Sequence, residues 1–113
     1  ECFVEVGEGL IVGLNSDRAA DSSELIQSAR MGELLDFVDA KLKPDLVLFD
    51  LPPMGVCDDV LAFLPRVDAV LLVVAAGTTT VTEVDECERQ ISQYDKLMGV
   101  VMNKSDRPSK EYY

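Results

Sequence analysis

The chain has 113 residues, 48% of them hydrophobic, and a formal net charge of −11 at pH 7. This length suits one domain or part of one, and the hydrophobic fraction is sufficient for a core. The negative charge argues against nucleic acid as a partner, because a phosphate backbone is bound by clustered lysines and arginines. The lack of histidine and of a C-x-x-C pair nearly excludes the usual zinc sites, and no apolar run is long enough to cross a membrane.

The first part of the chain predicts one strand and one helix. Residues 9–14 are a short apolar run that indicates a strand. After a polar loop, Asp21 and Glu24 have the spacing of a capping box at a helix start. Apolar residues then recur at helical spacing as far as Lys43, where Pro44 ends the helix.

Residues 46–49 are the apolar run that we take as the centre of the fold. Four apolar residues in a row are too short for a buried helix and predict a strand covered on both faces, as in a parallel sheet. Asp50 follows where such a strand leaves the sheet, and Pro52 and Pro53 cannot continue the ladder. Ligands of open α/β sheets bind at that edge, so Asp50 is a candidate site residue. The alternative is that Asp50 only caps the following turn.

Two further strands with helices between them follow. Residues 60–64 predict a short helix that Pro65 stops. Residues 68–76 are the longest apolar run and, being rich in β-branched residues, predict the most buried strand. A second capping box at Thr80 opens another helix, and residues 97–102 form the last strand.

The alternation of strands and helices predicts an α/β fold with a parallel sheet and helices on both faces. We expect residues 1–106 to form this domain and residues 107–113 to form a flexible, tyrosine-containing tail. Three cysteines without a pairing pattern indicate reduced thiols, as in a cytosol.

Asp59 and Asn103 are further candidate site residues. Asp59 lies in the loop after the prolines, where the alternative is an N-cap for the short helix. Asn103 follows the last strand, and its amide can both donate and accept, which suits the edge of a purine. Its alternative is a turn. Residues 103–106 also fit the Asn-Lys-x-Asp signature of GTP-binding proteins, which leaves the nucleotide open.

The sequence from Asp50 resembles the Walker B element of P-loop nucleotide hydrolases, in which an aspartate closing an apolar strand holds Mg²⁺. Residues 50–53, Asp-Leu-Pro-Pro, are similar to the Asp-Thr-Pro-Pro or Asp-Ser-Pro-Pro of the bacterial tyrosine autokinases of capsule and exopolysaccharide synthesis. These enzymes are relatives of the partition and division-site ATPases. Residues 23–31, Ser-Glu-Leu-Ile-Gln-Ser-Ala-Arg-Met, resemble the family's Pro-x-Glu-Leu-Leu-x-Ser-x-Arg-Met and give the most specific match. Leu51 stands where the family has a hydroxyl residue.

The resemblance implies a P-loop NTPase-like fold, ATP and Mg²⁺ as cofactors, and roles for five residues. Asp50 and Asp59 would be catalytic, with Asp50 holding the metal directly or through water. Asn103 would lie near adenine, and Tyr112 and Tyr113 would be phospho-acceptors, because the family carries a C-terminal tyrosine cluster that neighbouring subunits phosphorylate. An exposed tail without a role is the alternative for these tyrosines.

The phosphate-binding sequence G-x-x-x-x-G-K-[ST] is absent from the chain. In the family it precedes the region that this chain resembles, so we expect the C-terminal half of a kinase domain with no kinase activity of its own. The family further implies a membrane adaptor's cytoplasmic segment, a chain-length regulator, as partner, a homo-oligomer when intact, and a cytoplasmic location at the inner face of the membrane.

Three other functions fit parts of the sequence. A partition or positioning ATPase would act as a switch that dimerises on ATP and phosphorylates no protein. A GTP-binding switch would use the sequence Asn-Lys-Ser-Asp. A non-catalytic fragment would serve only as an interaction domain, a possibility that Leu51 keeps open.

Overall fold

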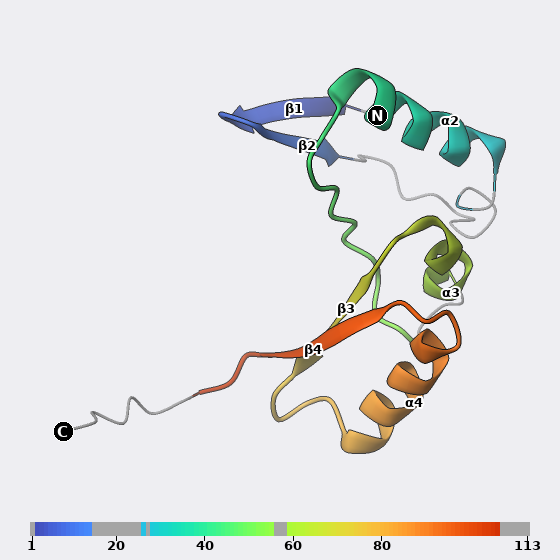
Figure 1. Cartoon of the computed structure of the whole chain (residues 1–113). Coiled ribbons are helices and arrows are strands. Elements are labelled where there is room, and N and C mark those ends of the chain that lie inside the picture. The colour runs from blue at the N-terminus through green and yellow to red at the C-terminus, as the bar shows by residue number, and fades with distance from the viewer. Residues whose placement is uncertain (1, 15–25, 27, 56–58, 107–113) are drawn as a thin grey trace.

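The structure is a computed structural model that describes residues 2–14, 26, 28–55 and 59–106. These residues have an α/β fold with an antiparallel pair of strands, a parallel pair and several helices (Figure 1). The elements follow in the order β1 (Cys2–Gly7), β2 (Leu10–Leu14), α2 (Ala29–Phe37), the π-helix η1 (Val38–Leu42), α3 (Asp59–Phe63), the 3₁₀ helix η2 (Leu64–Arg66), β3 (Val70–Ala75), α4 (Val81–Ser92) and β4 (Leu97–Asn103).

The strand predicted at residues 9–14 is present as β2, but it belongs to an antiparallel hairpin and not to a parallel sheet. It pairs with β1, which the sequence did not single out. The short connection contains Gly9 with a φ of +78°, a left-handed conformation that glycine adopts readily. A connection this short joins antiparallel strands only, because parallel strands need a long crossover. The hairpin contacts the helical segment through the rings of Phe3 and Phe37, whose centroids are 6.2 Å apart.

The first predicted helix is confirmed over most of its length as α2 followed by η1. It ends at Leu42, and the following residue, Lys43, turns the chain out of the helix with a φ of +47° directly before Pro44. The predicted capping box at Asp21 and Glu24 lies outside the described residues. The apolar stripe is only half-buried and consists of Met31, Leu34, Leu35, Val38 and Leu42.

The strand predicted at residues 46–49 is wrong for this structure. Residues 46–50 belong to no helix or strand, and the four apolar side chains are exposed, with 84% of Leu48 accessible. An apolar run indicates that a segment tends to be buried. A strand needs in addition the backbone of a neighbouring strand to pair with. The described parts of the chain provide no strand that pairs with residues 46–49.

The second half of the chain contains the predicted strands and helices, but in the described residues its parallel sheet has two strands, and Leu71 and Val73 are exposed where the sequence predicted helices on both faces. β3 and β4 pair in parallel from Val70 and Leu97 to Ala75 and Asn103, and α4 forms the crossover that packs on both strands (Figure 1). The predicted short helix is present as α3, and the chain continues through Pro65 as η2.

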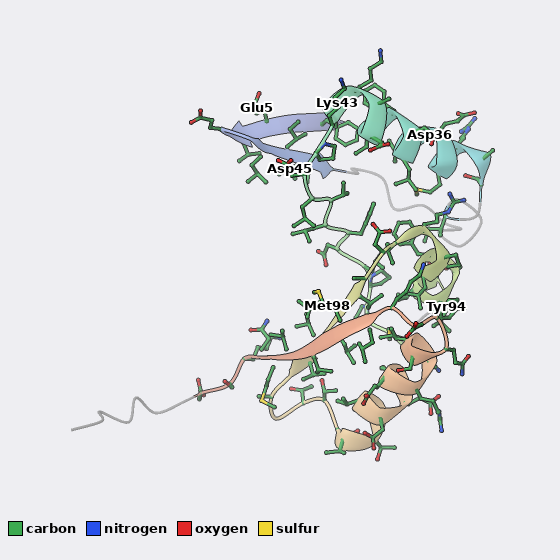
Figure 2. All side chains as sticks on the ribbon, viewed as in Figure 1. Glu5, Asp36, Lys43, Asp45, Tyr94 and Met98 are labelled. Atoms are coloured by element: carbon green, nitrogen blue, oxygen red, sulfur yellow. The ribbon has the colours of Figure 1, made fainter. Side chains whose placement is uncertain are left out.

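The core of the described residues is small and lies between α3, η2, β3 and α4. Its buried apolar side chains are Val60, Phe63, Leu64, Val74 and Ile91. Val74 makes β3 the most buried of the four strands, as predicted, but Leu71 and Val73 on the opposite side of that strand are exposed. Met98 of β4 is also largely exposed (Figure 2). The described helices include none with the length and apolar character that a membrane span requires.

Candidate functional site

Asp50 is an exposed carboxylate at the end of the unpaired stretch 46–50. The ring of the preceding residue, Phe49, meets the ring of Phe63 in α3 edge to face, with centroids 4.9 Å apart and planes at 68°. This geometry is a favourable one for aromatic pairs. The contact therefore holds the chain just before Asp50 against α3.

Asp59 lies in the first turn of α3 and is only 4% exposed. A carboxylate at this end of a helix is favoured by the unpaired backbone N–H groups and the helix dipole. Phe63, the ring that Phe49 contacts, lies four residues further along the same short helix. The two candidate aspartates thus flank one aromatic contact, Asp50 beside one ring and Asp59 one helical turn from the other.

Asn103 is the last residue of β4 and pairs with Ala75, the last residue of β3. It therefore lies at the carboxyl edge of the parallel pair, as predicted. Its side-chain oxygen accepts a hydrogen bond of 2.8 Å from the backbone N–H of Lys104, which has a φ of +56°. This is the turn-forming role that the sequence left open beside nucleotide binding. The exposed amide still carries N–H donors at the sheet edge.

The loop between β3 and α4 contacts Asn103 at this edge, where the Ala76 N–H donates a hydrogen bond of 2.9 Å to the Asn103 carbonyl. The loop is held by Thr79, whose hydroxyl accepts from the Ala75 N–H at 3.1 Å and whose own N–H donates to the Ala75 carbonyl at 2.9 Å. Sequence reasoning did not single out Thr79. The available signal was Gly77, with a φ of +74°, followed by three threonines directly after a strand.

The capping box predicted at Thr80 and Glu83 is confirmed and begins α4. The Thr80 hydroxyl accepts from the Glu83 N–H at 3.3 Å, and the Glu83 carboxylate accepts from the Thr80 N–H at 2.8 Å. The hydrogen bonds that the Glu83 carboxylate accepts from Thr80, first from its backbone N–H and then from its hydroxyl at 2.8 Å, lower the pKa of Glu83 below its usual value. The box fixes where α4 begins and hence the length of the loop beside Asn103.

Lys96 connects the α3–η2 segment to the parallel pair. Its ammonium group donates a hydrogen bond of 2.9 Å to the carbonyl of Leu64, and its own carbonyl accepts from the Val70 N–H at 2.8 Å. The α3–η2 segment and the amino ends of β3 and β4 are therefore parts of one packed unit.

The structure does not bring all the candidates together. Tyr112 and Tyr113 lie outside the described residues. Among the described residues no three acidic or cysteine side chains gather in a way that could hold a metal ion. Asp50 is nevertheless a suitable ligand type for Mg²⁺, which is commonly held by one or two carboxylates together with water and the phosphates of a nucleotide.

The chain is similar to several tyrosine-protein kinases. It is 27% identical over 106 residues to tyrosine-protein kinase CpsD of Streptococcus pneumoniae serotype 4, a match that covers 93% of this chain and 46% of the relative. It is 34% identical over 91 residues to the putative tyrosine-protein kinase EpsB of Ralstonia nicotianae and 32% identical over 94 residues to tyrosine-protein kinase wzc of Salmonella typhi. Each of these two matches covers 80% of this chain and 12% of the relative.

No protein-family model matches the chain. The chain spans slightly less than half the length of the streptococcal kinases and about an eighth of the two longer ones. These relatives come from three bacterial genera and are all named as tyrosine-protein kinases, EpsB as a putative one, and the matched region includes most of this chain. The chain is therefore related to the bacterial tyrosine-protein kinases and corresponds to a part of them, as its sequence motifs predict.

Proposed function

We propose that this chain is part of an ATP-dependent protein-tyrosine autokinase that regulates the synthesis and export of exopolysaccharide or capsule. The observation that carries the proposal is the match to streptococcal tyrosine-protein kinase CpsD over 93% of this chain. A match of that coverage necessarily includes Asp50 and Asp59. The polymer class comes from the family resemblance of the Asp-Leu-Pro-Pro and Glu-Leu-Ile-Gln-Ser-Ala-Arg-Met sequences.

The proposal includes a P-loop NTPase-like fold for the intact domain. The parallel pairing of β3 and β4 through the crossover helix α4 is consistent with this fold. In open parallel sheets ligands bind at the carboxyl ends of the strands, and Asn103 and the Thr79 loop lie there. Because the chain lacks the phosphate-binding loop, it has no kinase activity of its own under this proposal.

In the intact enzyme the residues of this chain would bind and position the reactants. The Asp50 carboxylate would hold Mg²⁺, directly or through water, and would help to activate the tyrosine hydroxyl that is phosphorylated. Asp59 supports this site from α3, and Asn103 donates to the edge of adenine. The metal neutralises charge on the phosphates when bound, which is the main electrostatic requirement of phosphoryl transfer.

Tyr112 and Tyr113 are the proposed phospho-acceptors. The proposed partner is the cytoplasmic segment of a membrane adaptor, or chain-length regulator, which would hold the intact kinase at the inner face of the membrane. A homo-oligomer would allow one subunit to phosphorylate the tyrosines of its neighbour.

The test is to incubate the full-length parent with Mg²⁺ and ATP and to map phosphate by mass spectrometry, with GTP in a parallel reaction. Phosphate on Tyr112 or Tyr113 with ATP supports the autokinase. Hydrolysis of ATP without modification of any tyrosine would instead identify a switch ATPase. Preference for GTP would identify a GTP-binding switch that uses the Asn103–Asp106 sequence.

A further inference from the structure

Thr79 fastens the loop between β3 and α4 to the end of β3 through one residue, Ala75. The Thr79 hydroxyl accepts a hydrogen bond of 3.1 Å from the Ala75 N–H, and the Thr79 N–H donates to the Ala75 carbonyl at 2.9 Å. Both lengths lie within the normal range for N–H···O hydrogen bonds. Because a side chain and a backbone group of Thr79 bind the same residue, the loop has a fixed position relative to the strand end.

The same strand end is bonded to Asn103 of β4. Ala75 is the register partner of Asn103, and the next residue, Ala76, donates its N–H to the Asn103 carbonyl at 2.9 Å. The loop that Thr79 holds therefore leaves the parallel pair directly beside Asn103 (Figure 1). A displacement of this loop from β3 would act on the hydrogen bond between Ala76 and Asn103.

The side chain of Asn103 has donors left for a ligand. Its side-chain oxygen accepts from the Lys104 N–H at 2.8 Å. Within the described part of the chain its amide N–H groups donate to no other atom. The backbone of Asn103 is thus fixed by Ala76 and its side chain by Lys104, and these two contacts set the position from which the amide can donate.

We propose that Thr79 is a positioning residue for the nucleotide base. It holds the loop on the end of β3 and, through Ala75 and Ala76, keeps Asn103 where its amide donates to the base. The inference rests on the proposed function, in which Asn103 contacts adenine. Thr79 itself touches neither the base nor the phosphates, so its loss weakens binding of the nucleotide and leaves the transfer step unchanged.

The three consecutive threonines of this loop have different roles. Thr80 caps α4. Thr78 donates its backbone N–H to the Ala75 carbonyl at 3.3 Å, and the described residues include no hydrogen-bond partner for its exposed hydroxyl. Thr79 is exposed as well, but its hydroxyl binds the strand end. Substitution of valine for threonine keeps the shape of the side chain and removes the hydroxyl, so Thr78→Val is a matched control for Thr79→Val.

Amide hydrogen exchange in the 113-residue chain tests the contact itself. We expect the Ala75 amide to exchange at least about 10-fold faster in Thr79→Val than in the original chain. In Thr79→Ser, which restores the hydroxyl, and in Thr78→Val, the rate should stay within about twofold of the original. Equal rates in Thr79→Val and the original chain would contradict the proposal.

Nucleotide binding by the full-length parent tests the role at the base. The probes are ATP and inorganic tripolyphosphate, which lacks both ribose and base, each titrated with Mg²⁺ present. Thr79→Val is expected to weaken ATP binding about 5-fold and to change tripolyphosphate binding less than about twofold. Thr79→Ser and Thr78→Val should both retain the ATP affinity. An equal loss for the two probes would contradict the proposal, because Thr79 would then support the site as a whole.

Kinetics separate this inference from the proposed function. In tyrosine phosphorylation by the parent, Thr79→Val should raise the KM for ATP about 5-fold and leave kcat within about twofold. If tyrosines are phosphorylated with an unchanged KM for ATP in Thr79→Val, the positioning role is wrong and the proposed function stands. If no tyrosine is phosphorylated but Thr79→Val binds ATP selectively more weakly, the positioning role stands and the proposed function is wrong.

Discussion

Strand β3 of the β3–α4–β4 unit and residues 46–49 are both continuous apolar runs, but the two regions have opposite structures. In the first, β3 and β4 pair in parallel, and α4 buries Ile91 against them. In the second, the apolar side chains are exposed and the backbone joins no strand. The difference teaches that an apolar run becomes a strand only where a partner strand is present, and the β3–α4–β4 unit contains its own partner.

The largest expected effect comes from shortening one buried side chain in the first region and one exposed side chain in the second. Ile91→Ala removes a fully buried side chain, and we expect it to lower the free energy of unfolding by about 2–5 kcal/mol. Leu48→Ala in the same 113-residue chain removes an exposed side chain and should change it by less than about 0.5 kcal/mol. Urea denaturation measures both. A comparable loss from Leu48→Ala would show that residues 46–49 are already covered.

The next effect concerns the connection between α3–η2 and the parallel pair. Lys96→Met removes the hydrogen bond from the ammonium group to the Leu64 carbonyl, and we expect a loss of about 1–2 kcal/mol. Lys41→Met, at an exposed position in η1, is the matched control and should be nearly neutral. Denaturation followed by circular dichroism checks the pair, and equal losses would mean that the Lys96 contact contributes nothing.

Thr80→Ala removes the capping hydroxyl of α4 and should cost about 1 kcal/mol of stability. Thr82→Ala, in the first turn of the same helix, removes a threonine that is not the cap and improves helix propensity, so it should not destabilise. Amide exchange in the first turn of α4 is the sensitive measurement. The capping account fails if the two variants exchange alike.

Glu83 provides a smaller effect that depends on pH. Its pKa is lower in the folded chain than in the unfolded one, because the ionised carboxylate accepts hydrogen bonds from Thr80. The stabilisation is therefore complete above the unfolded pKa and is lost as the pH falls through the folded pKa. Urea denaturation between neutral and acidic pH should show a steeper loss for the original chain than for Glu83→Gln. Identical pH profiles would contradict this assignment.

The smallest effect is kinetic and concerns Cys87, a half-buried thiol on the covered side of α4. Burial first, and then the carboxylates of Glu86 and Glu83, raise the pKa of this thiol. Because the thiolate is the reactive form, alkylation at neutral pH should be slower than in the urea-unfolded chain. Measurement in a background of Cys2→Ser and Cys57→Ser isolates Cys87, and Glu86→Gln should raise the rate. An unchanged alkylation rate in Glu86→Gln would show that the Glu86 carboxylate does not affect the reactivity of the thiol.

Local sequence signals predicted the features that local physics determines. The capping box at Thr80 and Glu83, the end of a helix before Pro44, and the position of Asn103 at the strand end are all confirmed. Each depends on residues within one turn or on the end of one apolar run.

The sequence signals failed where the structure depends on residues that are far apart in the sequence. The sequence did not predict the pairing of β2 with β1, because an apolar run by itself does not show which other segment of the chain pairs with it. The strand at residues 46–49 was predicted from apolar character alone, and the described chain has no strand for it. The burial of Asp59 could not be predicted, because the burial of a polar side chain depends on tertiary packing, and Asp59 lies in a short helix that also buries Val60 and Phe63.

The most direct test of the proposed kinase compares two aspartates of the same exposed stretch in the full-length parent. Asp50 and Asp45 are both exposed, and they flank residues 46–49 (Figure 2 labels Asp45). With Mg²⁺ and ATP, we expect Asp50→Ala to reduce phosphate on Tyr112 and Tyr113 at least about 100-fold and Asp45→Ala to leave it within about twofold. Unchanged phosphorylation in Asp50→Ala, or an equal loss in both variants, would contradict the role of Asp50 on which the proposed site depends.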